Sequence, residues 1–436
     1  MAPPSRQATT QDLLDFIAAS PTAAHAVAAS VARLEKAGFS RLDEADAWSL
    51  APGDAVYVVR GTNAVIAARI GREPAHETGF RLAGAHVDAP GLRLKPEALY
   101  SQEGYLQLGV EVYGGPLLAS WTDRDLTFAG RLLLKGRGGT PEVRLVQLDR
   151  PVCRIAQLAV HLNRDVNKDG LKLDKQRHLP PICGLGGEKE IAQGPVLQAL
   201  ARAAGVARER ILAAEVEIVD TQPPVIGGLD RSLYFAPRID NLAGSHAVLE
   251  GLLQASRPPR ATGVIALFDN EEIGSGTPEG AGSFFLDAVL ERITLAADPS
   301  REAWHRARAR SWFVSVDGVH AVHPNYPDLH DARHKPQLNG GPVVKVSALQ
   351  RYATDLRARH WFEACAAQAK VKLQYYVHRT DLRSGSTIGP MTAARLGVPG
   401  VDVGSPMLAM HSIRETGGVD DQLGMIRVLK QHFARA

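Results

Sequence analysis

Cysteine is scarce in this sequence of 436 residues, which contains only Cys153, Cys183 and Cys365. The three residues are scattered, and no Cys-x-x-Cys spacing occurs. The sequence therefore indicates neither a disulfide framework nor a zinc site built from thiolates. Any metal in this protein has to be held by histidines and carboxylates.

The sequence also lacks an excess of charge and long apolar runs. The 50 lysines and arginines nearly balance the 47 aspartates and glutamates, and the net charge of +3 gives no support for nucleic-acid binding. No run of about 18 apolar residues occurs, which argues against a membrane span. The first residues do not resemble a secretory signal, so we expect a cytoplasmic protein without nucleic-acid or membrane partners.

Length and composition favour a globular protein of about two or three domains. Hydrophobic residues make up 45% of the chain and charged residues 22%. Residues 92–230 have short alternating apolar segments and glycines, whereas the flanking stretches alternate strand-like and helix-like segments. We predict an α/β core formed by residues 1–91 and 231–436, interrupted by a β-rich domain whose ends lie beside Asp88 and Asp240.

Individual segments carry clear strand and helix patterns. We predict strands at residues 55–60, 64–70, 80–86, 105–112, 126–134, 263–268, 312–317 and 400–403. We predict helices starting near residues 9 and 21, a helix near residues 155–161, and helices at residues 195–204, 241–255, 357–370 and 417–434.

Glu271 and Glu272 are the most informative pair in the sequence. They closely follow the apolar run 263–268, which predicts a buried strand. Adjacent carboxylates on an extended chain point to opposite sides, so the pair suits two different tasks. One acid can hold a metal while its neighbour moves a proton, as metal-assisted hydrolysis requires. A Glu-Glu pair alone is typical of a solvated loop, so this interpretation depends on the other candidate residues.

Histidines and aspartates near the ends of other predicted elements complete a candidate metal site. His86 and Asp88 face the same side at the end of one strand, which suits a metal-binding imidazole oriented by a carboxylate. Asp240 precedes a predicted helix, where it can cap the helix or bridge two metal ions. Asp317 ends an apolar strand, and His411 lies in a loop after another. With the glutamate pair, these donors suffice for two zinc ions.

Six segments of the sequence resemble the aspartyl aminopeptidase family of zinc exopeptidases. They follow the family's order, at residues 84–91, 240–241, 269–275, 319–326, 387–390 and 410–415. The resemblance implies a zinc-exopeptidase-like α/β fold, in which helices flank a central mixed sheet and the inserted domain, residues 92–230, mediates dimerisation. It also implies that the protein uses an activated water to release N-terminal residues, preferentially Asp or Glu, from peptides.

The resemblance further implies two zinc ions per chain, with Mn²⁺ or Co²⁺ as possible substitutes. One zinc ion is expected at His86 and Asp317. The other is expected at Glu272 and His411, with Asp240 bridging both ions.

The same resemblance implies the catalytic roles. Glu271 is expected to take a proton from the attacking water and to deliver it to the leaving amine. Asp88 is expected to orient His86. None of these positions is substituted relative to the family's pattern, so nothing in the sequence argues against catalytic activity.

Four further residues are candidates for contacts with the substrate. A lone lysine in a strand is typically solvent-facing, but the resemblance implies that Lys345 meets the side-chain carboxylate of an acidic N-terminal residue. Tyr352 is expected in the same pocket. The resemblance implies that a neighbouring subunit delivers His161, which then contacts the substrate or lies near the metal; a buried structural histidine is the alternative. His320, shortly after Asp317, is a weaker candidate.

Expected partners are peptides with an acidic N-terminal residue and copies of the same chain, because the family forms tetrahedral dodecamers. A dinuclear zinc deacylase or carboxypeptidase is an alternative, in which Lys345 binds a C-terminal carboxylate. An aminopeptidase with neutral residue preference is another. A non-catalytic oligomeric scaffold would be expected to have lost Glu271 or a metal ligand, and the sequence retains them all.

Overall fold

Alternating strands and helices build a mixed α/β protein in the computed structural model, which describes residues 5–255 and 259–435. The mixed α/β class predicted from the sequence is confirmed. The chain forms two units. The first unit runs to Asp88, resumes over Pro224–Met410 and closes with the segment from Glu415 on. The second unit contains Ala89–Pro223 and the tetrapeptide His411–Arg414.

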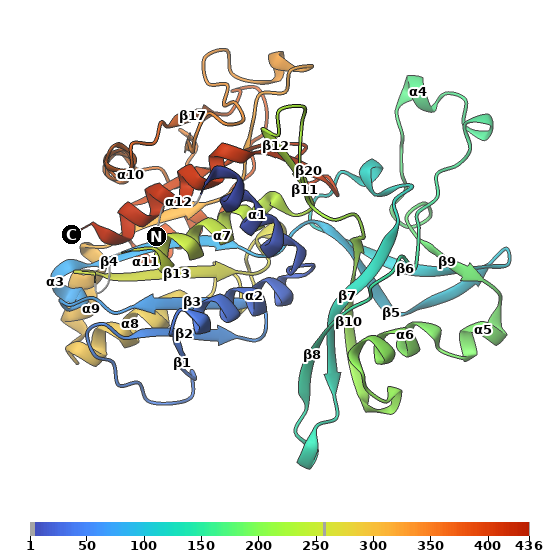
Figure 1. Cartoon of the computed structure of the whole chain (residues 1–436), viewed down its shortest axis with the longest axis horizontal. Helices are drawn as coiled ribbons and strands as arrows, with labels where there is room; N and C mark the ends of the chain where they lie inside the picture. Colours follow the sequence, from blue (N-terminus) through green and yellow to red (C-terminus); the bar gives the residue numbers. More distant parts are fainter. Residues whose placement is uncertain (1–4, 256–258, 436) are drawn as a thin grey trace. The chain divides into compact units, whose positions relative to one another are not determined.

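A mixed sheet is the centre of the first unit (Figure 1). Within the described residues it has nine strands, in the order β1 (Ser40–Arg41), β2 (Ala55–Arg60), β3 (Ala64–Arg69), β13 (Thr262–Phe268), β4 (Phe80–His86), β14 (Trp312–Val316), β18 (Gly400–Gly404), β16 (Val343–Val346) and β17 (Gln374–Val377). The central strands β13, β4, β14 and β18 run parallel to one another.

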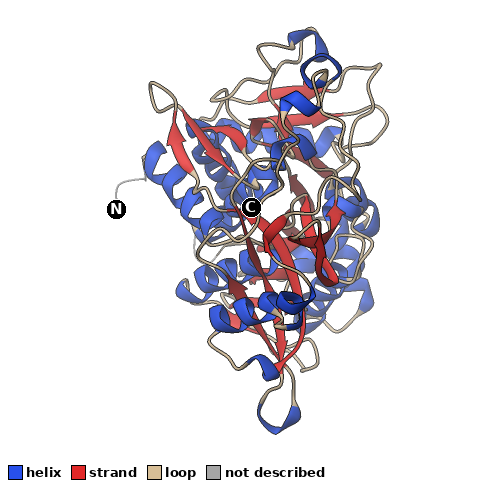
Figure 2. Ribbon diagram, turned by 90° about the vertical axis from the view of Figure 1, so that its right-hand side faces the viewer, coloured by secondary structure: helices blue, strands red, loops and turns tan. Residues whose placement is uncertain are grey.

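Helices cover both faces of this sheet (Figure 2) because alternate strand residues point to opposite sides. In β13, Ile265 and Leu267 enter one core while Val264 and Ala266 enter the other. The first core is closed by α1 (Arg6–Ala18), α2 (Ala23–Lys36), α7 (Ile239–Leu253), α10 (Leu356–Ala369) and α12 (Val419–Ala434). The second is closed by α8 (Phe285–Ala297), α9 (Arg301–Ala309) and α11 (Ile388–Leu396), with α3 (Ala75–Thr78) beside α9.

A smaller sheet also belongs to the first unit. Its strands, in order, are β11 (Val225–Gly227), β12 (Leu233–Ala236), β20 (Glu415–Gly418), β19 (Pro406–Leu408) and β15 (Val319–His320). β20 is antiparallel to both of its neighbours. This pairing places the start of the last helix, α12, next to β12, because α12 follows β20 directly.

The second unit is built on a sheet with the strand order β8 (Glu142–Gln147), β7 (Leu126–Leu134), β10 (Ile211–Asp220), β5 (Gly91–Gln102), β6 (Tyr105–Tyr113) and β9 (Ile182–Leu185). Its helices are α4 (Val166–Asp169), α5 (Glu188–Ala192) and α6 (Pro195–Ala204). The tetrapeptide joins this unit through Ile413, which is only 6% exposed in its apolar core. Arg414 donates to Asp220 Oδ2 and to the backbone oxygens of Gln222 and Pro223.

The helix predicted near residues 155–161 is wrong. Ile155 forms an isolated parallel bridge with Thr122, and Cys153 forms an antiparallel bridge with Leu126. Only a single 3₁₀ turn, η3 (Val160–Leu162), follows. Ile155 is β-branched and buried against the sheet, and the residues that follow it, mostly apolar, are exposed, so tertiary packing outweighs local helix propensity here.

Candidate metal centre

Three parallel strands bring the candidate residues to one edge of the large sheet. β4 pairs in parallel with β13 and with β14, so the carboxyl ends of all three strands meet there. His86 is the last residue of β4, the 3₁₀ turn η5 (Glu271–Ile273) follows β13, and Asp317 follows β14. Residues that are far apart in the sequence are therefore neighbours in the fold.

His86 directs one ring nitrogen toward a group of acids. Its Nδ1 lies 3.1 Å from the backbone oxygen of Asp88 and 3.3 Å from Asp88 Oδ1. Both partners are acceptors, so Nδ1 carries a proton, and in the neutral ring this tautomer leaves Nε2 able to bind a metal. Nε2 lies 3.4 Å from Asp317 Oδ1 and 3.6 Å from Asp240 Oδ1. All four residues are buried, and Nε2 is also 4.0 Å from Glu271 Oε2.

The electrostatics of this group reflect a shortage of positive charge. Burial opposes protonation of His86, but hydrogen bonding to Asp240, Asp317 and Asp88 outweighs it and raises its pKa well above the ordinary value. Burial and the charges of neighbouring acids raise the pKa of Glu271 to about 8, although His86 opposes this shift. A cation between these side chains would supply the missing charge.

Asp88 holds the turn that carries the two glutamates. Its Oδ1 and Oδ2 accept hydrogen bonds from the backbone N–H groups of Glu271 and Glu272, each at 3.1 Å. The prediction that the pair lies on extended chain is wrong, because Asn270 adopts a left-handed conformation with φ of 62° and the chain enters η5. Both carboxylates consequently lie in one group with His86.

Asp240 lies at the start of α7 and is 4% exposed. The N-cap position of α7 is Arg238 and Asp240 lies within the helix bounds, so the cap interpretation is wrong. Its backbone N–H instead donates to Glu415 Oε2 at 3.0 Å, and Asn241 Nδ2 donates to Val316 O. Sequence reasoning missed this role of Glu415, although Glu415 lies in the segment 410–415 that carries the family resemblance.

Lys345 is buried beside the acids instead of facing solvent. It lies on β16, is 3% exposed, and its Nζ is 3.4 Å from Asp317 Oδ2. Nζ also lies 5.4 Å from the ring centroid of Tyr352, which is buried as well. His320 is exposed, with its ring centroid 6.0 Å from that of Tyr376. The ring centroid of Tyr376 is in turn 6.5 Å from that of Tyr352, so Tyr376 lies between the predicted residues His320 and Tyr352.

Two predicted residues, His411 and His161, belong to the second unit. The Nδ1 of His411 is 3.0 Å from Gly115 O, and its backbone oxygen accepts from Leu117 N. A carbonyl only accepts, so Nδ1 is protonated and the tautomer leaves Nε2 able to bind a metal. His161 lies in η3 and is exposed, so its alternative reading as a buried structural histidine is wrong.

Asp12, His246 and Glu250 form another group with the donors of a metal site. Arg33 already supplies the cation there, because its Nη1 lies 2.8 Å from Asp12 Oδ2 and 3.0 Å from Glu250 Oε1. His246 Nε2 lies 2.8 Å from Asp12 Oδ2. This group has the arrangement of an ion-pair network that joins α1, α2 and α7.

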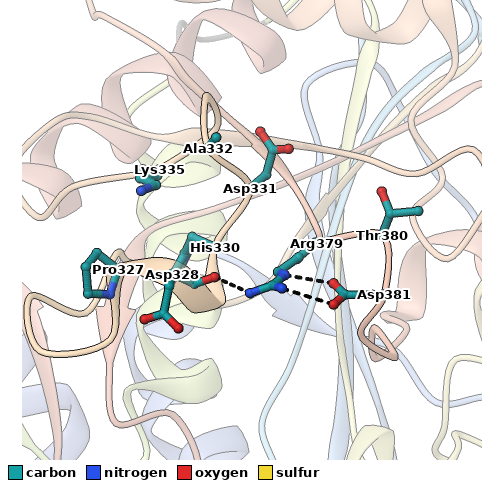
Figure 3. A pocket seen from close by; sticks show the side chains of 9 residues that line it. All are labelled: Pro327, Asp328, His330, Asp331, Ala332, Lys335, Arg379, Thr380 and Asp381. Atoms are coloured by element: carbon teal, nitrogen blue, oxygen red, sulfur yellow. Dashed lines mark hydrogen bonds and ion pairs between the residues drawn. The ribbon is translucent and has the colours of Figure 1, made fainter.

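An open cavity of about 610 Å³ in the first unit contains none of the predicted site residues (Figure 3). Two of its charged groups, Arg379 and Asp381, are paired with each other. Arg379 donates to both carboxylate oxygens of Asp381 and to the backbone oxygen of Asp328. We therefore place the functional site at the sheet edge, where the acids surround His86.

The donors at the sheet edge match the preferences of zinc, which binds imidazole nitrogen and carboxylate oxygen. Their ligand atoms form two groups, His86 with Asp240 and Asp317, and His86 with Glu271 and Glu272. Within each group these atoms lie within 4.8 Å of one another. A carboxylate with a raised pKa lies beside them, which suits proton transfer. Fold and site together define a metal-dependent hydrolase.

Comparison with known proteins gives the family. The model of the family "Aminopeptidase I zinc metalloprotease (M18)" matches residues 16–433. A probable M18 family aminopeptidase 2 of Pseudomonas aeruginosa is 44% identical over 431 residues, covering 98% of this chain and 99% of that protein. The chain belongs to the M18 family and is a zinc-type metalloaminopeptidase.

Solved structures agree with this assignment. The structure of Ape4 in complex with Nbr1 matches with a TM-score of 0.95 and 34% identity, covering 98% of this chain and 86% of that one. The dodecamer of mApe1 from S. cerevisiae matches with a TM-score of 0.84 and 29% identity, covering 98% and 96%. In the described part of the chain, no helix combines the length and apolar character needed to cross a membrane.

Proposed function

We propose that this aminopeptidase releases N-terminal Asp or Glu residues from peptides with the help of two zinc ions. The preference for acidic residues is supported by the burial of Lys345, whose ammonium group lies beside the acids of the metal centre. An ammonium in a partly dry pocket favours an acidic substrate side chain and disfavours Lys or Arg. Tyr352 and His320 are proposed to line the same pocket.

Each zinc ion has a proposed set of ligands. His86 and Asp317 would hold one ion, Glu272 and His411 would hold the other, and Asp240 would serve as a ligand to both. The distances around His86 Nε2 and the tautomer of His411 support this assignment. When bound, the ions polarise the scissile carbonyl and make water a stronger nucleophile at neutral pH. Mn²⁺ or Co²⁺ is expected to substitute because both accept nitrogen and oxygen donors.

Glu271 is proposed to move the proton. Its carboxylate takes a proton from the attacking water and delivers it to the nitrogen of the leaving peptide. Asp88 acts through its neighbours, since it accepts the backbone N–H groups of the glutamate turn and faces His86 Nδ1. The same carboxylate therefore positions the proton carrier and fixes the tautomer of a metal ligand.

The proposed assembly is a homo-oligomer in which the inserted domain mediates dimer contacts. The dodecamer of the related S. cerevisiae protein supports a dodecamer here. The exposure of His161 is consistent with delivery to a neighbouring chain's site. Leu158, Val160 and Leu162 around it are 60%, 49% and 74% exposed, which is unusual for apolar side chains unless a partner covers them.

A substrate panel tests the proposed function. Asp-, Glu-, Leu- and Lys-aminoacyl substrates would be compared with N-acyl amino acids, with and without a chelator, and with zinc, manganese or cobalt added back. We expect cleavage of Asp and Glu substrates that the chelator abolishes. Preferred cleavage of N-acyl substrates would favour a deacylase or carboxypeptidase. Preferred cleavage of Leu substrates would favour an aminopeptidase of neutral specificity.

A further inference from the structure

Asp402 is a fully buried acid that the proposed chemistry does not use. It lies on β18 with 0% exposure, and each of its carboxylate oxygens has a partner. Oδ1 accepts from Thr387 Oγ1 at 2.7 Å, and Oδ2 accepts from the backbone N–H of Ala353. Ala353 directly follows Tyr352, and Thr387 is the N-cap of α11. Asp402 therefore joins the segment that carries Tyr352 to the start of a helix.

Strand alternation places Asp402 and Lys345 on the same face of the sheet. β16 and β18 are antiparallel, with Val343 paired to Gly404 and Val344 to Val403. Lys345 and Asp402 are the residues next to this last pair, so both side chains leave the sheet on one face. Thr354 also connects them, since its Oγ1 donates to Lys345 O and accepts from the N–H of Asp402.

The two groups interact electrostatically. Burial raises the pKa of Asp402, and the ammonium of Lys345 opposes that shift. Burial disfavours the charge of Lys345, but Asp317 and other groups, Asp402 among them, outweigh it and raise its pKa. Opposite charges on one face of a buried sheet stabilise each other, because the interior screens them less than water does.

The Asp402 carboxylate is packed closely against α11. A Cβ atom at Gly389, in the first turn of α11, would lie 2.2 Å from Asp402 Oδ2. Glycine at that position therefore permits the close approach of the helix to the acid. A larger residue at position 389 would have to displace either the Asp402 carboxylate or α11, so the packing here leaves room for this carboxylate only because residue 389 is glycine.

We propose that Asp402 is a positioning residue for substrate selection, which acts through Lys345 and the Tyr352 segment. Thr354, whose hydroxyl bonds to the backbone of both Asp402 and Lys345, helps to hold the lysine in place, so that its ammonium can receive the carboxylate of an acidic N-terminal residue. The hydrogen bond that Asp402 accepts from Ala353 holds the wall of the same pocket. This proposal rests on the proposed function, in which Lys345 recognises the acidic side chain.

A bound metal would compete with Lys345 for the charge of Asp317. Asp317 also lies beside His86 and is a proposed zinc ligand, so a metal would share its charge. Asp402 is not among the groups of metal-donor side chains, so a bound metal would not share its carboxylate. It is therefore the acid whose interaction with Lys345 does not compete with the metal.

A double-mutant cycle on the full-length enzyme tests the proposal. The variants are Asp402→Asn, Lys345→Met and the combination, each assayed with Asp- and Leu-aminoacyl substrates. We expect Asp402→Asn to lower the ratio of Asp to Leu cleavage, measured as kcat/KM, by about 10-fold or more, the scale of a lost charged hydrogen bond. In the Lys345→Met background, Asp402→Asn should change that ratio much less, because the part of its effect that passes through the lysine is gone.

Thermal unfolding of the zinc-free proteins provides a readout that does not depend on activity. Asp402→Asn removes a negative charge near the buried ammonium of Lys345, so the Tm of this variant should fall. Adding Lys345→Met should recover part of that loss. If Asp402→Asn fails to fold while the double variant folds, the charge coupling is supported. If neither folds, Asp402 serves the fold and the proposal is overturned.

Asp421→Asn is the matched control, since Asp421 is also buried and accepts two backbone N–H groups, from Asn339 and Gly341. It should lower stability without changing the substrate ratio. An equal change of the ratio in both Asp→Asn variants would contradict a specific role for Asp402. If the Lys345→Met single variant keeps the wild-type ratio, the proposed recognition of Asp and Glu by Lys345 is contradicted. If Lys345→Met changes the ratio and Asp402→Asn does not, the role of Asp402 is contradicted while the role of Lys345 stands.

Discussion

Glu271 has the surroundings of a proton carrier at the scale of a single residue. It is partly buried, and its pKa is raised to about 8 by burial and by the acids around it. Replacing Glu271 with Gln keeps the shape of the side chain but removes its ability to accept a proton. We expect Glu271→Gln to keep its zinc and its fold and to lose at least about 100-fold in kcat.

The measurement is turnover of an Asp-aminoacyl substrate, with zinc content determined by mass spectrometry on the same sample. Glu73→Gln is a suitable control, because Glu73 is a surface residue paired with Arg260. Near-normal turnover in a zinc-loaded Glu271→Gln enzyme would remove Glu271 from the proposed mechanism.

Asp240→Asn and His411→Ala are expected to reduce zinc content, because each weakens or removes a proposed ligand. Asp12→Asn should leave zinc content unchanged, since Arg33 already neutralises that group of acids. Metal analysis after dialysis against a weak chelator would separate these cases. Two zinc ions per chain in both ligand variants, bound as tightly as in the wild type, would show that the ligand assignment is wrong.

Sequence reasoning found much of the site because its residues lie at the ends of apolar strands. His86 and Asp317 end predicted strands, whereas Asp240 precedes a predicted helix, and the structure brings the three side chains together. The hydrogen bond from Asp240 N–H to Glu415 and the burial of Lys345 were not predictable in the same way. Both depend on which strands become neighbours in the fold, which no local pattern encodes.

The last helix, α12, contains a buried histidine that links three elements. His432 Nδ1 accepts from Trp361 Nε1 of α10 at 3.0 Å, and Nε2 donates to Leu82 O of β4 at 3.1 Å. Burial, with a smaller contribution from Arg81, lowers the pKa of His432 to about 3. The ring is therefore neutral in the folded protein at neutral pH.

This shift predicts a loss of stability in acid. The unfolded chain binds a proton at His432 near pH 6.5, whereas the folded chain resists it down to about pH 3. Above about pH 6.5, protonation of His432 does not reduce the free energy of unfolding. As the pH falls from there toward 3, the free energy of unfolding drops by up to about 1.4 kcal/mol per pH unit. Urea unfolding of the wild type and His432→Gln at several pH values would measure it. Parallel stability curves would contradict the prediction.

The strands and helices with regular apolar patterns were predictable as elements. The strands expected at residues 126–134 and 263–268 and the helix expected at 195–204 match β7, β13 and α6. Strands β5, β10, β16 and β17 were not predicted. β16 and β17 are only four residues long, and β5 carries charged and polar residues on a partly exposed surface. In such strands, pairing with neighbours determines the conformation more than local sequence does.

The proposed shared site predicts complementation between chains at the scale of the whole molecule. A His161→Ala chain mixed with a Glu271→Gln chain should regain partial activity, because mixed oligomers contain some sites with both residues intact. Mixing Glu271→Gln with Asp240→Asn should regain none, since both changes affect the same chain's contribution. The mixture would be prepared by co-expression with two different tags and purified over both.

Light scattering on the wild type provides the independent check of assembly. A fully active monomer would exclude a shared site. Mixed oligomers that fail to complement would leave the assembly intact but place His161 in its own chain's site.

The tetrapeptide His411–Arg414 also bears on how this protein can change in evolution. An inserted domain bounded by two junctions can be lost or exchanged in a single recombination event. Here a third stretch of chain, with Ile413 and Arg414, is embedded in the second unit, while His411 beside them is a proposed zinc ligand. Removing the insert would leave an apolar side chain without its core and a ligand without its anchor at Gly115. The two units are therefore expected to be inherited together.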